Sequence, residues 1–316
     1  MSAKFQNSAS EARRIKVRAT AGGIHLFNRA TGTNVLIDEI RPSPANFSQA
    51  PRQVSIALTN ACDLACEYCY APKHQAHLPF EDLKGWLRDL DEHGAIGIGF
   101  GGGEPTLYPK LTEVCEFATK DTNLAVTLTT HAHRLTPKLL RGIEGNINFV
   151  RVSMDGVGST YEANRGRSFD DLIGRIKNLS SLVPFGINFV VNSETILDLD
   201  PAIELASKMN AREFLLLPEQ ATAFRLGIDE HTRRMLTTWV EGYSGAVPIS
   251  VSEGNSDGLP TCNPLPFETG LSAFAHIDAA GKLKRTSYDQ FGVTISQIGI
   301  IAALEQLKES HQLSIQ

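Results

Sequence analysis

Three of the five cysteines of this chain stand within one short segment. They are Cys62, Cys66 and Cys69, in a Cys-x3-Cys-x2-Cys arrangement. Three thiolates at this spacing can hold three irons of a [4Fe–4S] cube and leave the fourth iron without a protein ligand. An open iron, like the open position of a catalytic zinc, is a place where a cofactor or substrate can bind and react. The spacing therefore predicts one reactive iron–sulfur cluster.

A structural zinc site is the alternative for the same three cysteines. His74 or His77 could complete a tetrahedral Cys3His shell, and the chain would then be a zinc-stabilised binding module. Residues farther along the chain favour the cluster.

A run of glycines provides a second candidate site. Gly101, Gly102 and Gly103 precede Glu104 and Pro105, and glycines let a backbone approach a ligand closely. Residues 97–102 also fit the G-x-G-x-x-G fingerprint of nicotinamide oxidoreductases. That fingerprint should open a helix directly, whereas here Pro105 interrupts, so the nicotinamide reading is the weaker alternative.

The composition is that of an ordinary globular protein, with 42% hydrophobic and 21% charged residues among 316. A formal charge of −5 gives no electrostatic reason to expect nucleic acid or an anionic membrane as a partner. Residues 1–10 lack the apolar core of a signal peptide, and no apolar run is long enough to span a bilayer. The cysteine count is odd and three cysteines share one motif, so we expect a reducing, cytoplasmic environment and no disulfide framework.

Short β-rich runs alternate with helical patterns after residue 52, which predicts an α/β protein with a parallel sheet and right-handed crossovers. The expected strands are 54–58, 95–100, 124–129, 148–153, 185–191 and 213–217. The expected helices are 81–92, 110–119, 137–143, 169–182, 201–209 and 230–243. Two strands over 23–38 precede this unit, and a strand–turn–strand over 273–286 with a closing helix near 298–309 follows it.

The cysteine segment resembles the radical S-adenosylmethionine (radical SAM) enzymes, whose motif has an aromatic residue before the last cysteine, here Tyr68. The resemblance implies a partial (β/α)6 TIM-like barrel with S-adenosylmethionine (SAM) bound at one [4Fe–4S] cluster. In that family one electron from the reduced cluster cleaves SAM, and the 5′-deoxyadenosyl radical takes a hydrogen atom from the substrate. A low-potential electron donor of the flavodoxin or ferredoxin type is implied as a partner.

The glycine run is the second match to this family. Gly102, Gly103 and Glu104 correspond to its Gly-Gly-Glu-Pro run, which binds the amino group of SAM. After the third expected strand many relatives have Thr-Asn-Gly, whereas this chain has Thr130 and His131 in the last two positions. His131 and the nearby loop histidine His133 are therefore candidates for substrate contact.

Later strands are followed by further family motifs in the expected order. Ser153 and Asp155 match a Ser-x-Asp-Gly motif whose polar groups approach the ribose and carboxylate of SAM. Arg165 matches the Arg-Gly that follows, and its guanidinium could pair a carboxylate in bidentate fashion. Asn192 stands where the family has a ribose-contacting asparagine. A helix cap or turn is the ordinary role of residues such as Ser153 and Asp155.

The C-terminal residues resemble the SPASM/twitch extension of the peptide-modifying branch, which carries auxiliary clusters. Where relatives have a cysteine after the second strand, this chain has Thr286. The scattered Cys115 and Cys262 cannot ligate an auxiliary cluster, so we expect a degenerate extension and a single cluster. Cys262 could donate or relay a hydrogen atom, with a packed free thiol as its ordinary role, and Cys115 should be a packing residue.

The expected organisation has three parts. Residues 1–51 form a β-rich appendage and linker, residues 52–245 the radical SAM partial barrel, and residues 246–316 the degenerate twitch-like α+β extension. The resemblance favours a peptide substrate that is cross-linked, epimerised or dehydrogenated. A small-molecule biosynthetic intermediate is the alternative.

Overall fold

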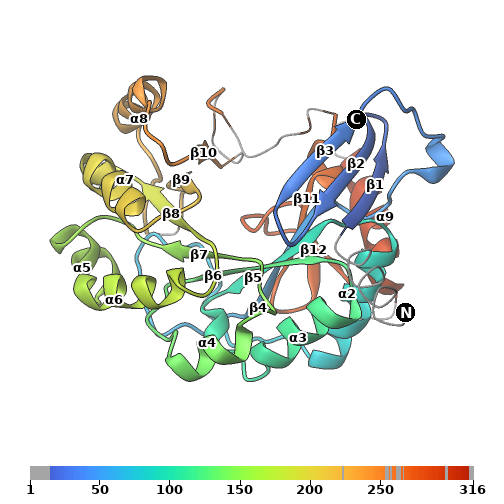
Figure 1. Cartoon of the computed structure of the whole chain (residues 1–316), viewed down its shortest axis with the longest axis horizontal. Helices are drawn as coiled ribbons and strands as arrows, with labels where there is room; N and C mark the ends of the chain where they lie inside the picture. The colour runs from blue at the N-terminus through green and yellow to red at the C-terminus, as the bar shows by residue number, and fades with distance from the viewer. Residues whose placement is uncertain are drawn as a thin grey trace, which may run out of the picture.

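Parallel strands and helices alternate along most of the chain (Figure 1). The computed structural model describes residues 15–222, 224–252, 256, 258–260, 265, 267–295 and 298–312. The strands are β1 (Ile15–Thr20), β2 (Gly23–Asn28), β3 (Thr33–Ile37), β4 (Gln53–Thr59), β5 (Gly97–Gly102), β6 (Ala125–Thr130), β7 (Phe149–Ser153), β8 (Phe185–Val191), β9 (Phe214–Pro218), β10 (Ile249–Val251), β11 (Phe274–Ile277), β12 (Lys282–Lys284) and β13 (Val293–Thr294). The helices are α2 (Phe80–Glu92), α3 (Leu111–Asp121), α4 (Pro137–Ile143), α5 (Ser159–Arg165), α6 (Phe169–Ser180), α7 (Leu199–Lys208), α8 (Glu230–Gly242) and α9 (Gly299–Gln312).

The central sheet has the order β10-β9-β8-β7-β6-β5-β4-β11-β12-β13. Consecutive strands from β4 to β10 pair in parallel, as the predicted β-then-α units require. β11 returns from far along the chain and pairs in parallel with β4, and the antiparallel hairpin of β12 and β13 extends that edge. The result is the expected α/β fold of a partial barrel, with the C-terminal hairpin in the same sheet.

The two faces of the sheet differ in chemistry. Toward the helices lie fully buried apolar residues such as Ile56, Phe100 and Val150, which pack in one core. The opposite face carries Ser55, Gly99 and Thr127 side by side on neighbouring strands, and all three remain partly accessible. This alternation gives the sheet one dry face and one polar, open face.

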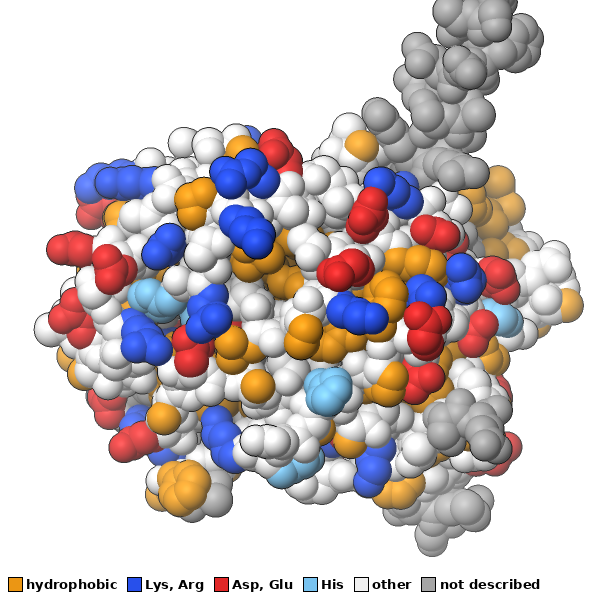
Figure 2. Space-filling view, turned by 90° about the horizontal axis from the view of Figure 1, so that it is seen from below, with side chains coloured by type: hydrophobic (Ala, Val, Ile, Leu, Met, Phe, Trp, Pro, Cys, Tyr) orange, Lys and Arg blue, Asp and Glu red, His pale blue; other side chains and the backbone are white. Residues whose placement is uncertain are grey.

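Capping residues fix where several helices begin, as α4 and α6 illustrate. The Thr136 side chain accepts a hydrogen bond from Leu139 N, and Pro137 starts α4. Ser168 caps α6 in the same way. On the face seen from below in Figure 2, acidic and basic side chains are mixed. Among the described residues, the helices are all too short or too polar to span a membrane.

The N-terminal sheet of β1, β2 and β3 packs at the amino-terminal edge of the parallel strands. Arg18 is buried, and its guanidinium donates to Ala50 O at 2.8 Å, Gly94 O at 3.0 Å and Ser272 O at 2.9 Å. These carbonyls come just before β4, β5 and β11. The Arg18 Nε also donates to both Glu268 oxygens at 3.1 Å, which pairs the buried charge.

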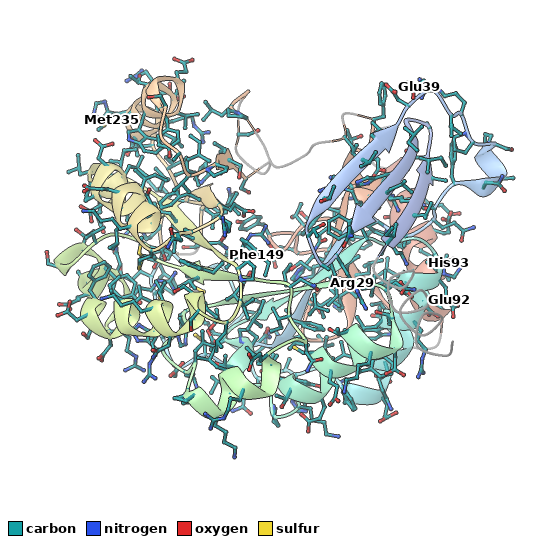
Figure 3. The ribbon with its side chains drawn as sticks, in the orientation of Figure 1. Arg29, Glu39, Glu92, His93, Phe149 and Met235 are labelled. Atoms are coloured by element: carbon teal, nitrogen blue, oxygen red, sulfur yellow. The ribbon has the colours of Figure 1, made fainter. Side chains whose placement is uncertain are left out.

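Arg29 makes a second attachment to this edge. From the turn after β2 its guanidinium reaches the start of β6, where it donates to Thr122 O at 2.9 Å and Leu124 O at 3.1 Å (Figure 3). The amino-terminal ends of β4, β5, β6 and β11 are thus covered, and the carboxyl-terminal ends of these strands face the other way.

All six predicted strands and six predicted helices of the repeating unit are confirmed within a few residues. The hairpin of β2 and β3, the strand–turn–strand of β11 and β12 and the closing helix α9 are also confirmed, whereas β1, β10, β13 and α5 are additional elements. The glycine-rich 97–102 segment is strand β5 itself, followed by a short 3-10 turn over Pro105–Leu107 rather than by a helix. The domain boundaries at 51/52 and 245/246 stay a prediction, although β10 and β11 lie in the sheet of the central unit.

Candidate functional site

The three motif cysteines lie on a loop that leaves the carboxyl end of β4, which we call the Cys loop (residues 60–79). Cys62 is exposed, Cys66 and Cys69 are half-buried, and all three are free thiols. Cys69 N donates to Cys66 O at 3.2 Å, and Leu64 N lies 3.4 Å from Cys62 Sγ. The loop therefore presents three unpaired thiols above the end of one strand.

The glycine run lies directly against the Cys loop. Gly103 N donates to Thr59 O and Glu104 N donates to Ala61 O, both at 2.7 Å. A Cβ at position 103 would lie 2.4 Å from Ala61 O, and one at Gly102 would lie 2.2 Å from Thr59 O. Gly102 also has a φ of +131°, which disfavours other residues. The glycines thus bring two backbone segments together, which the sequence alone had assigned to a ligand contact.

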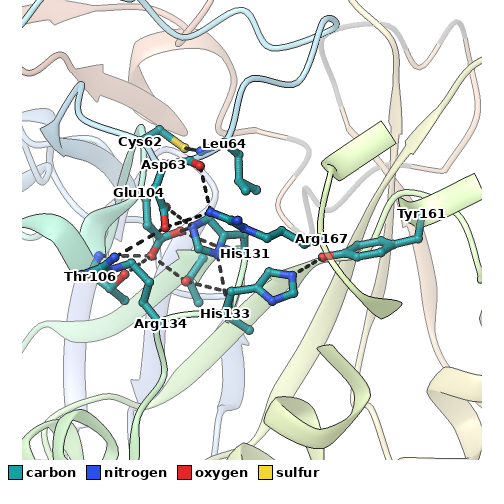
Figure 4. Close-up of polar contacts among 12 residues, drawn as sticks. Cys62, Asp63, Leu64, Glu104, Thr106, His131, His133, Arg134, Tyr161 and Arg167 are labelled. Atoms are coloured by element: carbon teal, nitrogen blue, oxygen red, sulfur yellow. Dashed lines mark hydrogen bonds and ion pairs between the residues drawn. The ribbon is translucent and has the colours of Figure 1, made fainter. Parts of the chain in front are cut away.

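Glu104 is a fully buried carboxylate with an unusually complete set of donors. Its Oε1 accepts from Thr106 N at 3.1 Å, Thr106 Oγ1 at 2.6 Å and Thr130 Oγ1 at 2.7 Å. Its Oε2 accepts from His131 N at 3.0 Å. The side chain therefore joins the glycine run to the loop after β6 (Figure 4).

His131 connects this carboxylate to the Cys loop. Its buried ring places Nε2 2.9 Å from Asp63 Oδ1 and 3.3 Å from Glu104 Oε2. Burial alone would raise the pKa of Asp63, but the contact with His131 and the nearby Arg134 bring that pKa below its ordinary value. Asp63 is a site residue that the sequence analysis missed, although it directly follows Cys62.

Cys62, Asp63 and His131 also form a possible metal site, because their ligand atoms all lie within 4.8 Å of one another. This group differs from the predicted zinc shell. His77 forms a β-bridge with Thr59, and the His74 ring contacts Asn60. The metal-ligating neighbours of Cys62 among the described residues are therefore not the histidines that the zinc reading used.

A second polar cluster surrounds Asp155 at the end of β7. Tyr68 OH donates to Asp155 Oδ2 at 2.7 Å, Val190 N donates to Oδ1 at 2.7 Å, and Arg165 pairs with the same carboxylate. The Arg165 guanidinium also lies 5.7 Å from the centre of the Tyr68 ring. The carboxylate that the sequence analysis expected Arg165 to pair is thus the chain's own Asp155.

Charge and burial act in opposite directions on Arg165 and in the same direction on Tyr68. Burial disfavours the charged guanidinium, but Asp155 more than compensates and raises the pKa of Arg165. Burial and the Asp155 carboxylate together raise the pKa of Tyr68, so its hydroxyl stays protonated.

Two buried polar atoms beside Asp155 have no hydrogen-bond partner among the described residues. They are Arg165 Nε and Asn188 Oδ1. Asn188 pairs with Ser153 across β7 and β8, so both orphan atoms belong to this end of the sheet. Buried polar groups are normally satisfied, and a polar ligand here would supply the missing donor and acceptor.

Asn192 has a different environment from the one expected of a ligand contact. Its Oδ1 accepts from Glu194 N at 3.0 Å and Thr195 N at 2.9 Å, and its Nδ2 donates to Glu219 Oε2 at 2.7 Å. Arg225 Nε donates to the same carboxylate at 2.8 Å. Asn192 therefore holds the loops after β8 and β9 together.

His133 lies apart from the Cys loop and contacts Tyr161 OH at 2.8 Å. Burial, together with nearby positive charge, lowers the pKa of His133 to about 4, so the ring is neutral at physiological pH. Tyr161 on α5 was not predicted, because its helix was not predicted.

Two further cysteines, Cys115 and Cys262, lie outside the cysteine motif. Cys115 is fully buried in α3, where burial raises the pKa of its thiol, which confirms its packing role. Cys262 lies outside the described residues. At the position where relatives have a cysteine, Thr286 bonds Asp289, and the Tyr288 ring lies 4.3 Å from that of Tyr70 in the Cys loop.

Comparisons with known proteins agree with this geometry. Residues 56–206 match the profile of the Radical SAM superfamily. Fe-coproporphyrin III synthase of Methanosarcina barkeri is 28% identical over 166 residues, 50% of this chain and 41% of that protein. Mycofactocin maturase MftC of Mycobacterium tuberculosis is 29% identical over 171 residues, 51% of this chain and 43% of that protein. The chain thus matches less than half the length of either relative.

A solved structure extends the comparison over nearly the whole chain. Streptococcus suis SuiB, bound to precursor peptide SuiA, superposes with a TM-score of 0.75 at 13% identity. The superposition covers 95% of this chain and 89% of that one, and it shows a shared fold. By its cysteine motif, its parallel sheet and the match of residues 56–206, about half of this chain corresponds to the Radical SAM superfamily, and the chain resembles the SPASM/twitch branch of peptide maturases.

Proposed function

We propose that this protein reductively cleaves SAM at a single [4Fe–4S] cluster and uses the resulting radical to modify a peptide. The observation that carries the proposal is a pair of hydrogen bonds, from Gly103 N to Thr59 O at the end of β4 and from Glu104 N to Ala61 O in the Cys loop. They hold the cysteine motif and the glycine motif against each other at the carboxyl ends of β4 and β5.

The donor set at this unit fits an iron–sulfur cluster. Cys62, Cys66 and Cys69 would hold it as thiolates. Thiolate sulfur is the ligand that iron–sulfur clusters prefer. When bound, the cluster and SAM supply the one-electron cleavage that generates a 5′-deoxyadenosyl radical. The chain itself binds, orients and shields these groups.

The environment of Glu104 bears on how SAM would be bound. Because both of its carboxylate oxygens already accept hydrogen bonds, we infer that Glu104 acts mainly by fixing the loop backbone. The backbone carbonyls of Gly102 and Gly103 are then the groups offered to the amino group of SAM. His131 would keep this loop in register with Asp63, in addition to any substrate contact.

The polar side chains around Asp155 would bind the parts of SAM other than its amino group. Arg165 Nε and Asn188 Oδ1 are the buried donor and acceptor that the described residues leave unmatched there. Ser153, half-buried at the end of β7, and Tyr68, over which Arg165 lies, would line the same part of the site. Asn192 would contribute through the loop that it holds rather than by a free side chain.

A peptide is the proposed substrate, with cross-linking, epimerisation or dehydrogenation as the outcome. The relatives named above include a peptide-bound structure and a maturase, which supports this choice. A small biosynthetic intermediate is the second candidate, favoured by the similarity to Fe-coproporphyrin III synthase. We further propose a cytoplasmic location, a low-potential donor of the flavodoxin or ferredoxin type, and neither nucleic acid nor membrane as a partner.

The test is anaerobic reconstitution with iron and sulfide, reduction with dithionite, addition of SAM, and measurement of 5′-deoxyadenosine. Wild-type protein should form it, and Cys62→Ala should not. An assembled cluster without product in the wild type would contradict the proposed cleavage, and absence of a cluster would favour zinc, which metal analysis would then find.

A second measurement addresses the number of clusters and the role of Cys262. Cys262→Ala should leave the iron content unchanged, because only three cysteines stand at a cluster spacing. Loss of about half the iron would reveal a second cluster. If Cys262 relays a hydrogen atom, the variant should still form 5′-deoxyadenosine but leave the substrate unmodified.

A further inference from the structure

The rim around the Cys loop carries opposite charge in two places. Asp63 meets two arginines from the loops after β6 and α5, whereas Glu67 meets a region rich in carboxylates after β8 and β9. Both acidic residues lie within the cysteine motif, so the two regions flank the same proposed cluster.

The basic region consists of Arg134 and Arg167. Arg134 Nη1 and Arg167 Nη2 each lie 3.5 Å from Asp63 Oδ2, and Arg167 Nη2 also donates to Asp63 O at 3.1 Å (Figure 4). Their side chains are 47% and 42% exposed. Two guanidinium groups thus share one carboxylate and leave an excess of positive charge at the surface, one residue from Cys62.

The acidic region has the reverse balance. Arg225 faces Glu219 at 2.8 Å, Glu194 at 3.4 Å and Glu67 at 3.8 Å, so one guanidinium stands against three carboxylates. Glu67 and Glu194 are largely exposed. An acidic protein approaching this rim would be repelled here and attracted to the basic region.

We propose that Arg134 and Arg167 form the docking surface for an acidic, flavodoxin-type electron carrier. The inference rests on the proposed function, since it assumes a cluster on Cys62, Cys66 and Cys69. In the step concerned, the carrier is oxidised by one electron and the cluster is reduced by it, with no bond formed or broken in this chain. Because electron transfer rates fall steeply with distance, a carrier held one residue from a cluster ligand is well placed.

The docking test is binding of purified oxidised flavodoxin to reconstituted protein by calorimetry. Arg134→Glu with Arg167→Glu should raise the Kd at least about tenfold at low ionic strength. This difference should shrink in about 0.5 M salt, where screening lengths fall to a few ångströms. The lysine pair, Arg134→Lys with Arg167→Lys, should bind nearly as the wild type does.

The matched control reverses two basic residues at the far ends of their helices, Arg141 on α4 and Lys177 on α6. Arg141→Glu with Lys177→Glu changes the net charge by the same amount and should bind flavodoxin as the wild type does. An equal loss in the control, an unchanged Kd in the Arg134/Arg167 double variant, or tighter binding of a ferredoxin would each overturn the proposal.

Dithionite separates this proposal from the proposed function. With dithionite as reductant, the Arg134/Arg167 glutamate variant should form 5′-deoxyadenosine at the wild-type rate per bound iron, whereas with reduced flavodoxin its rate per bound iron should fall. An equal fall with both reductants would instead mean that the arginines only hold Asp63. Failure of the wild type with dithionite would contradict the proposed function, while the calorimetry would still decide the docking surface.

Discussion

His131 Nε2 lies 2.9 Å from Asp63 Oδ1, so the loop after β6 is tied to the residue that follows the first motif cysteine. The same nitrogen lies 3.3 Å from Glu104 Oε2. One buried ring thus touches both the Cys loop and the glycine motif, although it belongs to neither segment. The position where many relatives have asparagine is here a connecting residue.

Replacing His131 by alanine should loosen this connection. Glu104 and Asp63 would each lose a contact, at a cost of about 1–3 kcal/mol in the free energy of unfolding. We expect lower iron retention and weaker SAM binding by calorimetry. His133→Phe is the control, since His133 contacts Tyr161 rather than the Cys loop. Equal iron loss in both variants would contradict a specific role for His131.

A methyl group at position 103 should displace the Cys loop. The Cβ of Gly103→Ala would lie 2.4 Å from Ala61 O and 2.5 Å from Asn60 O, so backbone must move at a cost of about 1–3 kcal/mol. Gly101→Ala is a matched control, because its Cβ meets nothing within 4 Å. Iron per chain after reconstitution should drop for the first variant and stay at the wild-type value for the second. The reverse order would refute the close contact.

Asp155→Asn should affect SAM binding without removing the cluster. The change leaves the buried Arg165 without its carboxylate, which typically costs about 3–5 kcal/mol. Denaturant unfolding and SAM calorimetry would measure the two effects. Tyr68→Phe removes one hydrogen bond to the same carboxylate and should cost about 1 kcal/mol. A stable Asp155→Asn protein with wild-type SAM affinity would show that the polar side chains around Asp155 do not belong to the SAM site.

Stability should fall on mild acidification because of His276. This residue is buried between β4 and β12, and burial lowers its pKa to about 4, with Asp278 and Asp289 opposing the shift and Lys284 adding to it. A depressed pKa means that the unfolded chain takes up a proton below about pH 6.5 while the folded chain does not until about pH 4. Stability is complete above that range and declines as pH falls through it.

The expected loss from His276 is at most about 2 kcal/mol between pH 7 and pH 5. His276→Gln should flatten this part of the pH dependence in urea unfolding. If the wild type and the variant lose stability in parallel, other groups are responsible.

Local patterns predicted the repeating part of the fold well. The strands from β4 to β9 and their helices follow from hydrophobic periodicity and from caps such as Ser168, because these signals act over a few residues. The pairing of β11 with β4 could not be read in this way, since Ala275 and Val54 are partners from opposite ends of the chain.

β1 was missed because its alternation is reversed. Lys16 and Arg18 point inward to Asp91 and Glu268, while Ile15 and Val17 are exposed, so the charged residues are the buried ones. A period of two is present in the sequence, but the charged residues are the buried ones, which is the reverse of the usual strand pattern.

The motifs of the candidate site were predicted from the sequence, but the contacts between side chains on different loops were not. The cysteines and Glu104 were identified from spacing, whereas the role of Asp63 depends on His131, a residue that only the fold brings near. Arg165 was expected to pair with a carboxylate, and the structure identifies that partner as Asp155, which the sequence alone did not. Spacing reports which side chains share a loop, but contacts between loops depend on the register of the sheet.

The N-terminal sheet covers part of the amino-terminal edge of the parallel strands. Arg18 and Arg29 donate hydrogen bonds to carbonyls just before β4, β5, β6 and β11, so the carboxyl-terminal edge with the Cys loop is the more open one there. Substrate, SAM and electron carrier would then share one rim. If SAM is cleaved there as proposed, 5′-deoxyadenosine and methionine would leave by the side from which the next SAM arrives, so a docked carrier or a long substrate would slow turnover by blocking that side.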